Sequence, residues 1–211
     1  MSTLEGFFPA TSMPDPDWWL ALWPRPAEIL AKLDLARQAE VVDLCSGDGL
    51  FTIPLARMVR HVAAIDLDSR MLARARDRAQ AAGLTNCSFI EGNAYDLARL
   101  VPDPVDWVLI ANTFHGVPDK SRLARAVAAV LQPNGRFAVI NWHRRSREET
   151  IVLGQPRGPK TEMRMTPEDV AMAVGGTGLR QLSVVNLPPY HYVAIFETSH
   201  QLSRSTAPDQ P

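Results

Sequence analysis

The chain of 211 residues carries 22 basic and 23 acidic side chains, a net charge of −1, and 46% of its residues are apolar. These values suit a single globular domain with a substantial core, and they lack the basic footprint that nucleic-acid binding requires. No apolar run approaches the roughly 20 residues that cross a bilayer, and the amino-terminal segment is unlike a signal peptide. We therefore expect a cytoplasmic protein with neither a nucleic-acid nor a membrane partner.

The cysteines and histidines do not predict a metal site. Cys45 and Cys87 each lie in or beside a predicted buried strand, which favours reduced thiols over a disulfide. No Cys-x-x-Cys occurs, and the histidines show no paired ligand spacing. The histidines are His61, His115, His143, His191 and His200.

The amino-terminal 35 residues predict an aromatic helical cap. Residues 1–16 show little periodicity and are expected to be loosely held, and a short helical pattern then runs to the break at Pro24. Two interpretations remain open for the tryptophans in this helix: they dock it on the core, or they cover the site as a hydrophobic lid that stacks on a substrate. These residues are Trp18, Trp19 and Trp23.

Residues 41–52 predict a strand, a tight turn and a helix over residues 50–60. The glycines of the turn let the backbone approach a ligand closely, and the helix that follows offers free N–H groups. The segment is not a dinucleotide fingerprint, because Thr52 stands where a third glycine would be needed, and no P-loop follows. Asp43, below the turn, suits a cationic ammonium better than a pyrophosphate.

The pattern Asp43-x-x-x-Gly47-x-Gly49 resembles motif I of the class I S-adenosylmethionine-dependent methyltransferases. That family commonly has glycine at the position of Cys45. The resemblance extends over about residues 36–198 and implies an α/β fold, with a doubly wound, Rossmann-like, seven-stranded and mostly parallel sheet, helices on both faces and an antiparallel carboxyl-terminal hairpin. It also implies S-adenosylmethionine as cofactor, with S-adenosylhomocysteine as product, and Asp43, Cys45, Gly47 and Gly49 as cofactor-binding residues.

Residues 61–66 read as a second buried strand that ends in Asp66. A carboxylate at this position can accept both ribose hydroxyls of an adenosyl ligand, and residues 65–72 resemble the junction between strand and helix in the family, which brings Leu67 into the cofactor site. Asp68 or Ser69 is the predicted N-cap of a helix that runs to residue 82. The alternative is that Asp66 only caps this helix.

Residues 87–95 predict a third strand and a turn that contains Asn93 and Ala94. The family often has an aspartate at the position of Asn93, in contact with the adenine amino group, and the amide oxygen of Asn93 can accept the same hydrogen bond. An ordinary Asx-turn is the alternative.

Residues 106–112 form the fourth predicted strand, and residues 112–120 after it resemble motif IV of the small-molecule methyltransferases. This places Asn112 beside the cofactor and makes His115 the first catalytic candidate, as a general base near neutral pH. The alternative role for His115 is a pocket wall. A helix over residues 119–131, a turn at 132–135 and a strand over 136–141 follow, and the alternation predicts a site at the carboxyl ends of the strands.

Residues 142–165 predict a long, charged loop at the carboxyl end of the fifth strand. Loops of this length in compact domains are usually functional or disordered, and a solvated loop is the alternative here. Its arginines would favour a carboxylate or another anion, and His143 is a second, weaker catalytic candidate. The residues that we assign to the substrate pocket or its selection in this loop are Trp142, His143, Glu149, Arg157 and Arg164.

The carboxyl-terminal part predicts a helix capped by Thr166 and two final strands over residues 179–185 and 192–197. Resemblance to the family implies that these strands form an antiparallel hairpin. Tyr190 and His191 between them are candidates for the acceptor pocket, and residues 199–211 are expected to be a disordered tail.

The sequence therefore predicts an enzyme that transfers a methyl group from S-adenosylmethionine to a small-molecule acceptor by in-line displacement. Aminopropyl transfer is one alternative, and a non-catalytic regulatory protein that retains the ligand pocket is another. We expect a monomer or a homodimer. The sequence does not identify the acceptor or the atom that is methylated.

Overall fold

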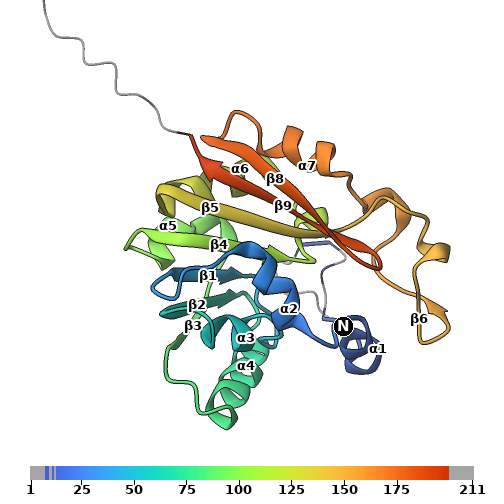
Figure 1. Cartoon of the computed structure of the whole chain (residues 1–211), viewed down its shortest axis with the longest axis horizontal. Coiled ribbons are helices and arrows are strands. Elements are labelled where there is room, and N and C mark those ends of the chain that lie inside the picture. Colours follow the sequence, from blue (N-terminus) through green and yellow to red (C-terminus); the bar gives the residue numbers. More distant parts are fainter. Residues whose placement is uncertain (1–7, 10, 12, 200–211) are drawn as a thin grey trace, which may run out of the picture.

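The computed structural model describes residues 8, 9, 11 and 13–199, and its main feature is a seven-stranded sheet with the order β3-β2-β1-β4-β5-β9-β8 (Figure 1). The first five strands along the chain run parallel, and β9 and β8 add an antiparallel hairpin at the β5 edge. The sheet order confirms the predicted fold class. The strands are β1 (Glu40–Leu44), β2 (His61–Asp66), β3 (Cys87–Glu91), β4 (Val105–Ala111), β5 (Leu131–Trp142), β8 (Leu179–Leu187) and β9 (His191–Thr198).

Helices cover both faces of this sheet (Figure 1). The buried side chains of α1, α2 and α3 belong to one hydrophobic cluster with one face of the sheet, and those of α5, α6 and α7 to a second cluster with the other face. In the described part of the chain, no helix has the length and apolar character needed to span a membrane. The helices are α1 (Pro16–Leu22), α2 (Pro26–Leu30), α3 (Thr52–Ala56), α4 (Ser69–Ala81), α5 (Leu97–Leu100), α6 (Lys120–Val130) and α7 (Pro167–Val174).

The two clusters follow from the period of a strand, because successive side chains point to opposite faces. In β1, Val41 packs with α1–α3, whereas Val42 packs with α5–α7. In β4, Leu109 lies on the first face and Val108 on the second. Both faces of the central strands are therefore apolar, which is why these strands read as continuous hydrophobic runs.

Two helix starts agree with the sequence. The side chain of Asp68 accepts a hydrogen bond from the backbone N–H of Arg70 at 2.9 Å at the start of α4. Thr166 and Asp169 form a reciprocal capping box at the start of α7, with distances of 3.1 and 2.8 Å. Each side chain satisfies a backbone donor that the helix itself leaves free.

The predicted helix over residues 50–60 is wrong in extent, because α3 spans only Thr52–Ala56. The N–H groups of Arg57 and Met58 bond to the carbonyls three residues earlier, at 3.3 and 2.8 Å, which tightens the last turn. The chain enters β2 at His61, only a few residues after the helix ends. The connection therefore has no room for a longer helix.

The predicted turn at 132–135 is part of β5, where the pairing with β4 shifts register between Val105 and Trp107. Asn134 has a φ of +64° in this irregular part of the strand. The turn residues thus bend a strand instead of ending one.

The predicted loop of residues 142–165 contains short elements of its own. It includes the 3-10 helices Arg147–Glu149 and Thr161–Met163, and between them a small hairpin of β6 (Ile151–Val152) and β7 (Gln155–Pro156). The hairpin lies beside α1, which brings this segment next to the amino-terminal helix.

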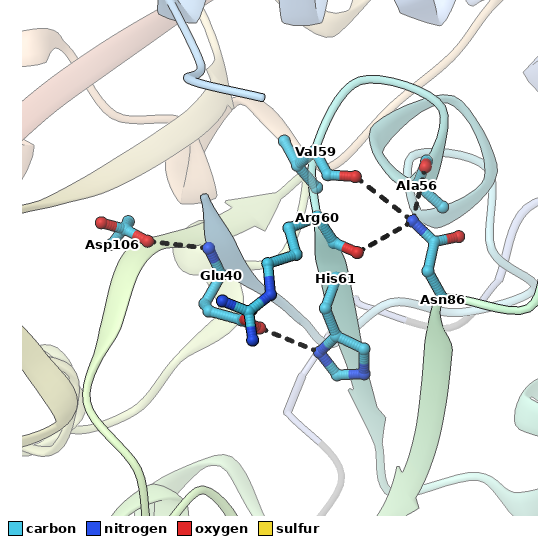
Figure 2. Close-up of polar contacts among 7 residues, drawn as sticks. All are labelled: Glu40, Ala56, Val59, Arg60, His61, Asn86 and Asp106. Carbon is cyan, nitrogen blue, oxygen red and sulfur yellow. Dashed lines mark hydrogen bonds and ion pairs between the residues drawn. The ribbon is translucent and has the colours of Figure 1, made fainter. Parts of the chain in front are cut away.

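Polar contacts connect the amino-terminal ends of the parallel strands (Figure 2). The backbone N–H of Glu40 donates to the carboxylate of Asp106 at 2.7 Å, and the Glu40 carboxylate pairs with Arg60 and His61 at 3.1 and 3.3 Å. The side-chain amide of Asn86 donates to three backbone carbonyls of the segment before β2, at 2.8 to 3.2 Å. These contacts stabilise the side of the sheet where the amino-terminal ends of the parallel strands meet, opposite their carboxyl ends.

We predict that Gly49→Ala destabilises the fold by about 2–4 kcal/mol. Gly49 has a φ of +85°, and an added Cβ would lie 3.0 Å from the Cβ of Ala75 in α4. The variant would therefore combine backbone strain with overpacking between the turn and this helix. Urea unfolding of wild type and variant measures the loss.

Gly83→Ala is the matched control, because Gly83 has a φ of +68° and nothing within 4 Å of an added Cβ. Only the backbone strain of a left-handed alanine should act in this variant, and it should lower the free energy of unfolding by about 1–2 kcal/mol. Equal losses in the two variants would show that the contact between Gly49 and α4 tolerates a methyl group.

Candidate active site

A cavity of about 990 Å³ lies at the carboxyl ends of the parallel strands. Its wall includes residues at or just after the ends of β1 to β5, together with residues from the amino-terminal segment and from the 147–160 segment. In doubly wound folds, ligands bind in a cleft at the carboxyl ends of the strands, beside the point at which the strand order reverses. Here that point lies between β1 and β4, the neighbours at the centre of the sheet.

Nearly all the residues that the sequence assigns to the cofactor line this cavity. The exception is Gly49, which packs against Ala75 of α4 and lies outside the lining. Its lack of a side chain allows α4 to pack closely against the turn after β1. The predicted residues that line the cavity are Asp43, Cys45, Gly47, Asp66, Leu67, Asn93, Ala94 and Asn112.

The carboxylate of Asp66 joins the end of β2 to the turn after β1. One oxygen accepts the backbone N–H of Gly47 at 2.8 Å, and the other accepts that of Asp68 at 2.9 Å. Burial raises the pKa of Asp66, and these backbone hydrogen bonds act in the opposite direction. Because each carboxylate oxygen has two lone pairs, Asp66 keeps acceptor capacity for a hydroxyl in the cavity.

Asp43 lies deeper, with 2% of its surface exposed. Its carboxylate accepts a hydrogen bond from the hydroxyl of Thr52 at 2.6 Å. Burial raises the pKa of Asp43 to about 7, the Thr52 hydrogen bond opposes this rise, and repulsion from Asp66 adds to it. A cation in the cavity would favour the charged form of this acid.

The turn after β1 has a left-handed backbone at Cys45 and Gly47, with φ values of +59° and +55°. Cys45 is therefore a side chain in a conformation that glycine adopts without cost, and it occupies the position where the resembled family commonly has glycine. Burial raises the pKa of its thiol, so it is an unreactive neutral group.

Several buried polar atoms of the cavity lining have no hydrogen-bond partner among the described residues. At the end beside β1 and β4 they include the hydroxyl of Ser46, one carboxylate oxygen of Asp48 and both polar atoms of the Asn112 side chain. Asn112 also has a φ of +57°. Buried polar groups are normally paired, so this end of the cavity fits a ligand that is itself polar.

The described part of the amino-terminal segment lies over this end. Phe8, Thr11 and Met13 line the cavity, and the Phe8 ring meets the Tyr95 ring edge-on at 5.5 Å. The sequence predicted a loosely held segment over residues 1–16, of which residues 1–7, 10 and 12 lie outside the described part, as do residues 200–211 of the predicted tail. Sequence reasoning missed these cavity residues, although the apolar Phe8 and Met13 were a signal.

The far end of the cavity is aromatic and basic. Trp18 and Trp19 of α1 line it together with Trp142 at the end of β5. Arg157 also lines this end, and its guanidinium carbon lies 5.5 Å from the centroid of the Trp18 ring. His115, which is 6% exposed, belongs to the same lining.

Several residues predicted for the acceptor side lie outside this cavity. Trp23 and Tyr190 line a separate cavity of about 420 Å³. Arg164 is buried and donates to backbone carbonyls of Pro159 and Arg157 and to the hydroxyl of Thr150. His143 contacts the side chain of Asn186 at 2.8 Å, and Glu149 is exposed.

His191 also lies outside the main cavity, between the rings of Trp23 and Trp142 at centroid distances of 4.5 and 4.2 Å. Burial lowers the pKa of this histidine well below its ordinary value, and repulsion from nearby basic groups acts in the same direction. His191 is therefore a neutral packing residue beside the aromatic end.

Comparison with known proteins gives consistent results. A family model described as a methyltransferase domain matches residues 41–135. A demethylmenaquinone methyltransferase of Listeria welshimeri is 30% identical over 118 residues, which cover 54% of this chain and 49% of the relative. A 23S rRNA (uracil(1939)-C(5))-methyltransferase of Xanthomonas oryzae is 48% identical over 60 residues, or 28% of this chain and 14% of that protein.

Solved structures share the fold. The crystal structure of a SAM-dependent methyltransferase from Aquifex aeolicus has a TM-score of 0.73 and 24% identity, over 88% of this chain and 94% of that one. Residues 41–135 thus match a methyltransferase domain, and the sheet order and motifs resemble those of the class I, S-adenosylmethionine-dependent type. The chain spans about half the length, 49%, of the first curated relatives that it matches.

S-adenosylmethionine is the cofactor of this class of domain, and the residues present fit it. The buried Asp43 and the partly buried Asp66 suit its ammonium and its ribose hydroxyls, and the unpartnered polar atoms of Ser46 and Asn112 provide hydrogen-bonding groups. Gly47 leaves space that a Cβ would narrow, because that atom would lie 3.3 Å from the Met13 sulfur. This end of the cavity can therefore hold a polar, cationic ligand.

The pKa of Asp43 predicts a specific dependence of stability on pH. With a pKa of about 7 when folded and an ordinary value of 3.8, Asp43 keeps a proton in the folded protein over a range where the unfolded chain has lost it. Its contribution to stability is therefore greatest below about pH 4 and falls as the pH rises through about 7. When the pH is raised from 5 to 8, the free energy of unfolding of the ligand-free Asp43→Asn variant should increase by about 1–3 kcal/mol relative to that of wild type.

Urea unfolding of both proteins at the two pH values measures this change. Asp103→Asn removes a carboxyl group at an exposed position and serves as the control, for which the difference from wild type should stay constant. A constant difference for Asp43→Asn as well would mean that Asp43 is ionised at pH 5 in the folded protein.

Proposed function

We propose that this protein transfers the methyl group of S-adenosylmethionine to a small-molecule acceptor inside the 990 Å³ cavity. One observation carries the proposal: a single cavity extends from the acidic turn after β1 to the aromatic residues of α1 and β5. Its volume is at the upper end of the roughly 300–1,000 Å³ found for ligand pockets, which leaves room for a cofactor and an acceptor together.

The cofactor residues lie on the β1–β4 side of the cavity. In our proposal Asp66 accepts the ribose hydroxyls, while Asp43 provides negative charge for the ammonium group. Leu67, Asn93 and Ala94 contact the adenine. Gly47, Cys45 and Asn112 shape the backbone around the rest of the cofactor. The support is that all these residues line one cavity, and that Asp66 is held in place by two backbone N–H groups.

The acceptor residues lie on the side of α1 and β5. Trp18, Trp19 and Trp142 would stack against the acceptor and keep water out, and Arg157 would select its charge. The bound cofactor supplies an activated methyl group, so the protein's contribution is alignment of the acceptor for in-line displacement and exclusion of water.

The names of the matched relatives differ in acceptor, one being demethylmenaquinone and another 23S rRNA. The small-molecule proposal rests on the cavity and on the net charge of −1, which gives no general attraction for nucleic acid. The two free cysteines support a reducing, cytoplasmic location. We further propose that residues 1–35 act as a cap on the domain, because α1 and the segment before it line the cavity.

The first prediction from this function is micromolar binding of S-adenosylmethionine and S-adenosylhomocysteine to wild type in a calorimetric titration. Asp66→Ala should weaken binding by about tenfold or more, since it removes a charged hydrogen-bond acceptor. Because Asp66 also holds the turn after β1, Leu67→Ala is the second variant. Its side chain makes no hydrogen bond that the turn needs, and a loss of several-fold is expected from reduced apolar contact.

Absence of binding by wild type would overturn the proposed function. Binding without formation of S-adenosylhomocysteine in a broad acceptor screen would favour the alternative, a non-catalytic regulatory protein that retains the ligand pocket.

The second prediction concerns His115, which we propose as general base for an acceptor that carries a proton. With such an acceptor, His115→Asn should lower kcat by about 10²–10⁴-fold and should leave S-adenosylhomocysteine affinity within twofold of wild type. Steady-state kinetics measures the change, and the acidic limb of the pH–kcat profile should disappear. A rise in KM with kcat and the pH profile unchanged would identify His115 as a pocket wall instead.

A further inference from the structure

The two ends of the main cavity carry opposite charge. The acids Asp43 and Asp66 lie at the ends of β1 and β2, whereas Arg147, Arg157 and Lys160 lie in the segment after β5. Strands β1 and β4 separate β2 from β5 in the sheet. The two groups of charge therefore come from different parts of the cavity wall.

The arginines of the basic end form no ion pair with an acid of the described residues. No carboxylate of a described residue lies within 4.0 Å of the guanidinium of Arg147 or Arg157, although Arg70, another cation of the lining, pairs with Asp68 at 2.9 Å. The Nε atom of Arg157 is buried and makes no hydrogen bond with a described residue. A buried guanidinium N–H requires an acceptor.

The nearby acids form no ion pair with these arginines among the described residues: Asp15, the acid of the lining next to α1, is exposed and has no cation within 4.0 Å. Glu148 hydrogen-bonds the hydroxyl of Ser146, and Glu149 accepts the backbone N–H of Ser146 at 3.2 Å. Both glutamates are exposed and lie outside the cavity lining. Lys160 has only a distant contact of 4.0 Å with Glu162, which is exposed.

The basic end of the cavity also contains aromatic side chains. The guanidinium of Arg157 lies over the Trp18 ring at 5.5 Å. Gly158, the next residue, packs against the Trp142 indole so closely that an added Cβ would lie 2.8 Å from ring atoms. The indoles of Trp18, Trp19 and Trp142 all belong to the cavity lining, and a wall with three indoles favours an aromatic ligand.

Hydrogen bonds fix the segment that carries these cations. Arg164 donates to the backbone carbonyls of Pro159 and Arg157 at 3.1 and 3.0 Å. The hydroxyl of Tyr190 bonds both the N–H and the carbonyl of Ile151, at 3.1 and 2.9 Å. The position of the Arg157 backbone is thus set without any ligand, and such preorganisation reduces the entropy that binding would cost.

We infer that the acceptor is a planar aromatic molecule with an anionic group, such as a carboxylate, and that Arg157 is the residue that selects it. This inference rests on the proposed function, because it assigns the basic end of the cavity to the acceptor. The anionic group pairs with Arg157, assisted by the charge of Arg147, and the ring lies among Trp18, Trp19 and Trp142. A neutral ligand of the same shape leaves the arginine unpaired.

The test compares binding of 2-naphthoate with that of 2-naphthamide, two probes of the same shape that differ in charge. Calorimetric titration is done on the whole protein, with and without saturating S-adenosylhomocysteine. Wild type should bind the naphthoate about tenfold or more tightly than the amide. Arg157→Gln should abolish this preference, and Arg157→Lys should restore part of it, since lysine keeps the charge and loses the planar fork.

The matched control is Arg145→Gln, which removes an exposed arginine of the same segment that lies outside the cavity lining. It should keep the full preference, and all variants should keep the S-adenosylhomocysteine affinity of wild type. This second affinity separates the two proposals: its absence in wild type overturns the methyltransferase function, whereas a naphthoate preference that depends on Arg157 still supports the anion site.

Three results would overturn the inference. One is equal binding of the two probes by wild type, and another is a preference that persists in Arg157→Gln. The third is failure of both probes to bind at millimolar concentration while S-adenosylhomocysteine binds.

Discussion

The carboxylate of Asp66 is the contact on which the site depends. Its two oxygens accept the N–H groups of Gly47 and Asp68, so a single side chain fixes the turn after β1 relative to the start of α4. Each of these groups belongs to a segment that lines the cavity. Hydrogen bonds of the chain itself therefore hold the cofactor end of the cavity in place before any ligand arrives.

The polar contacts that stabilise the sheet and the residues of the candidate active site lie at opposite ends of the parallel strands. At the amino-terminal edge, polar groups are paired, as Glu40 with Asp106 and Asn86 with three carbonyls. At the carboxyl edge, Asp43 is buried with its pKa raised, and polar atoms of Ser46 and Asn112 have no partner among the described residues. Unfavourable features of this kind collect at functional sites, where a ligand relieves them.

The sequence predicted the sheet well because the central strands are continuous apolar runs and two of them lead into local signals. These signals are Asp43 before the glycines and Asp66 before a helix cap. It predicted the acceptor side less well. Whether Arg157 or Arg164 faces the cavity depends on tertiary contacts of the 147–164 segment, and no periodicity encodes those contacts. Trp18 and Trp23 are likewise five positions apart in one aromatic stretch, yet they line different cavities.

The charges at the two ends of the cavity also bear on the reaction. Acidic groups near the cofactor favour a cation there, and basic groups at the far end favour an anion, so each ligand strengthens the field that attracts the other. Within a cavity of low polarity this attraction is larger than in water. An anion beside Arg157 and a cation beside Asp43 would therefore bind cooperatively, and the order of binding need not be fixed by any movement of the chain. The cavity itself provides the alignment that methyl transfer requires.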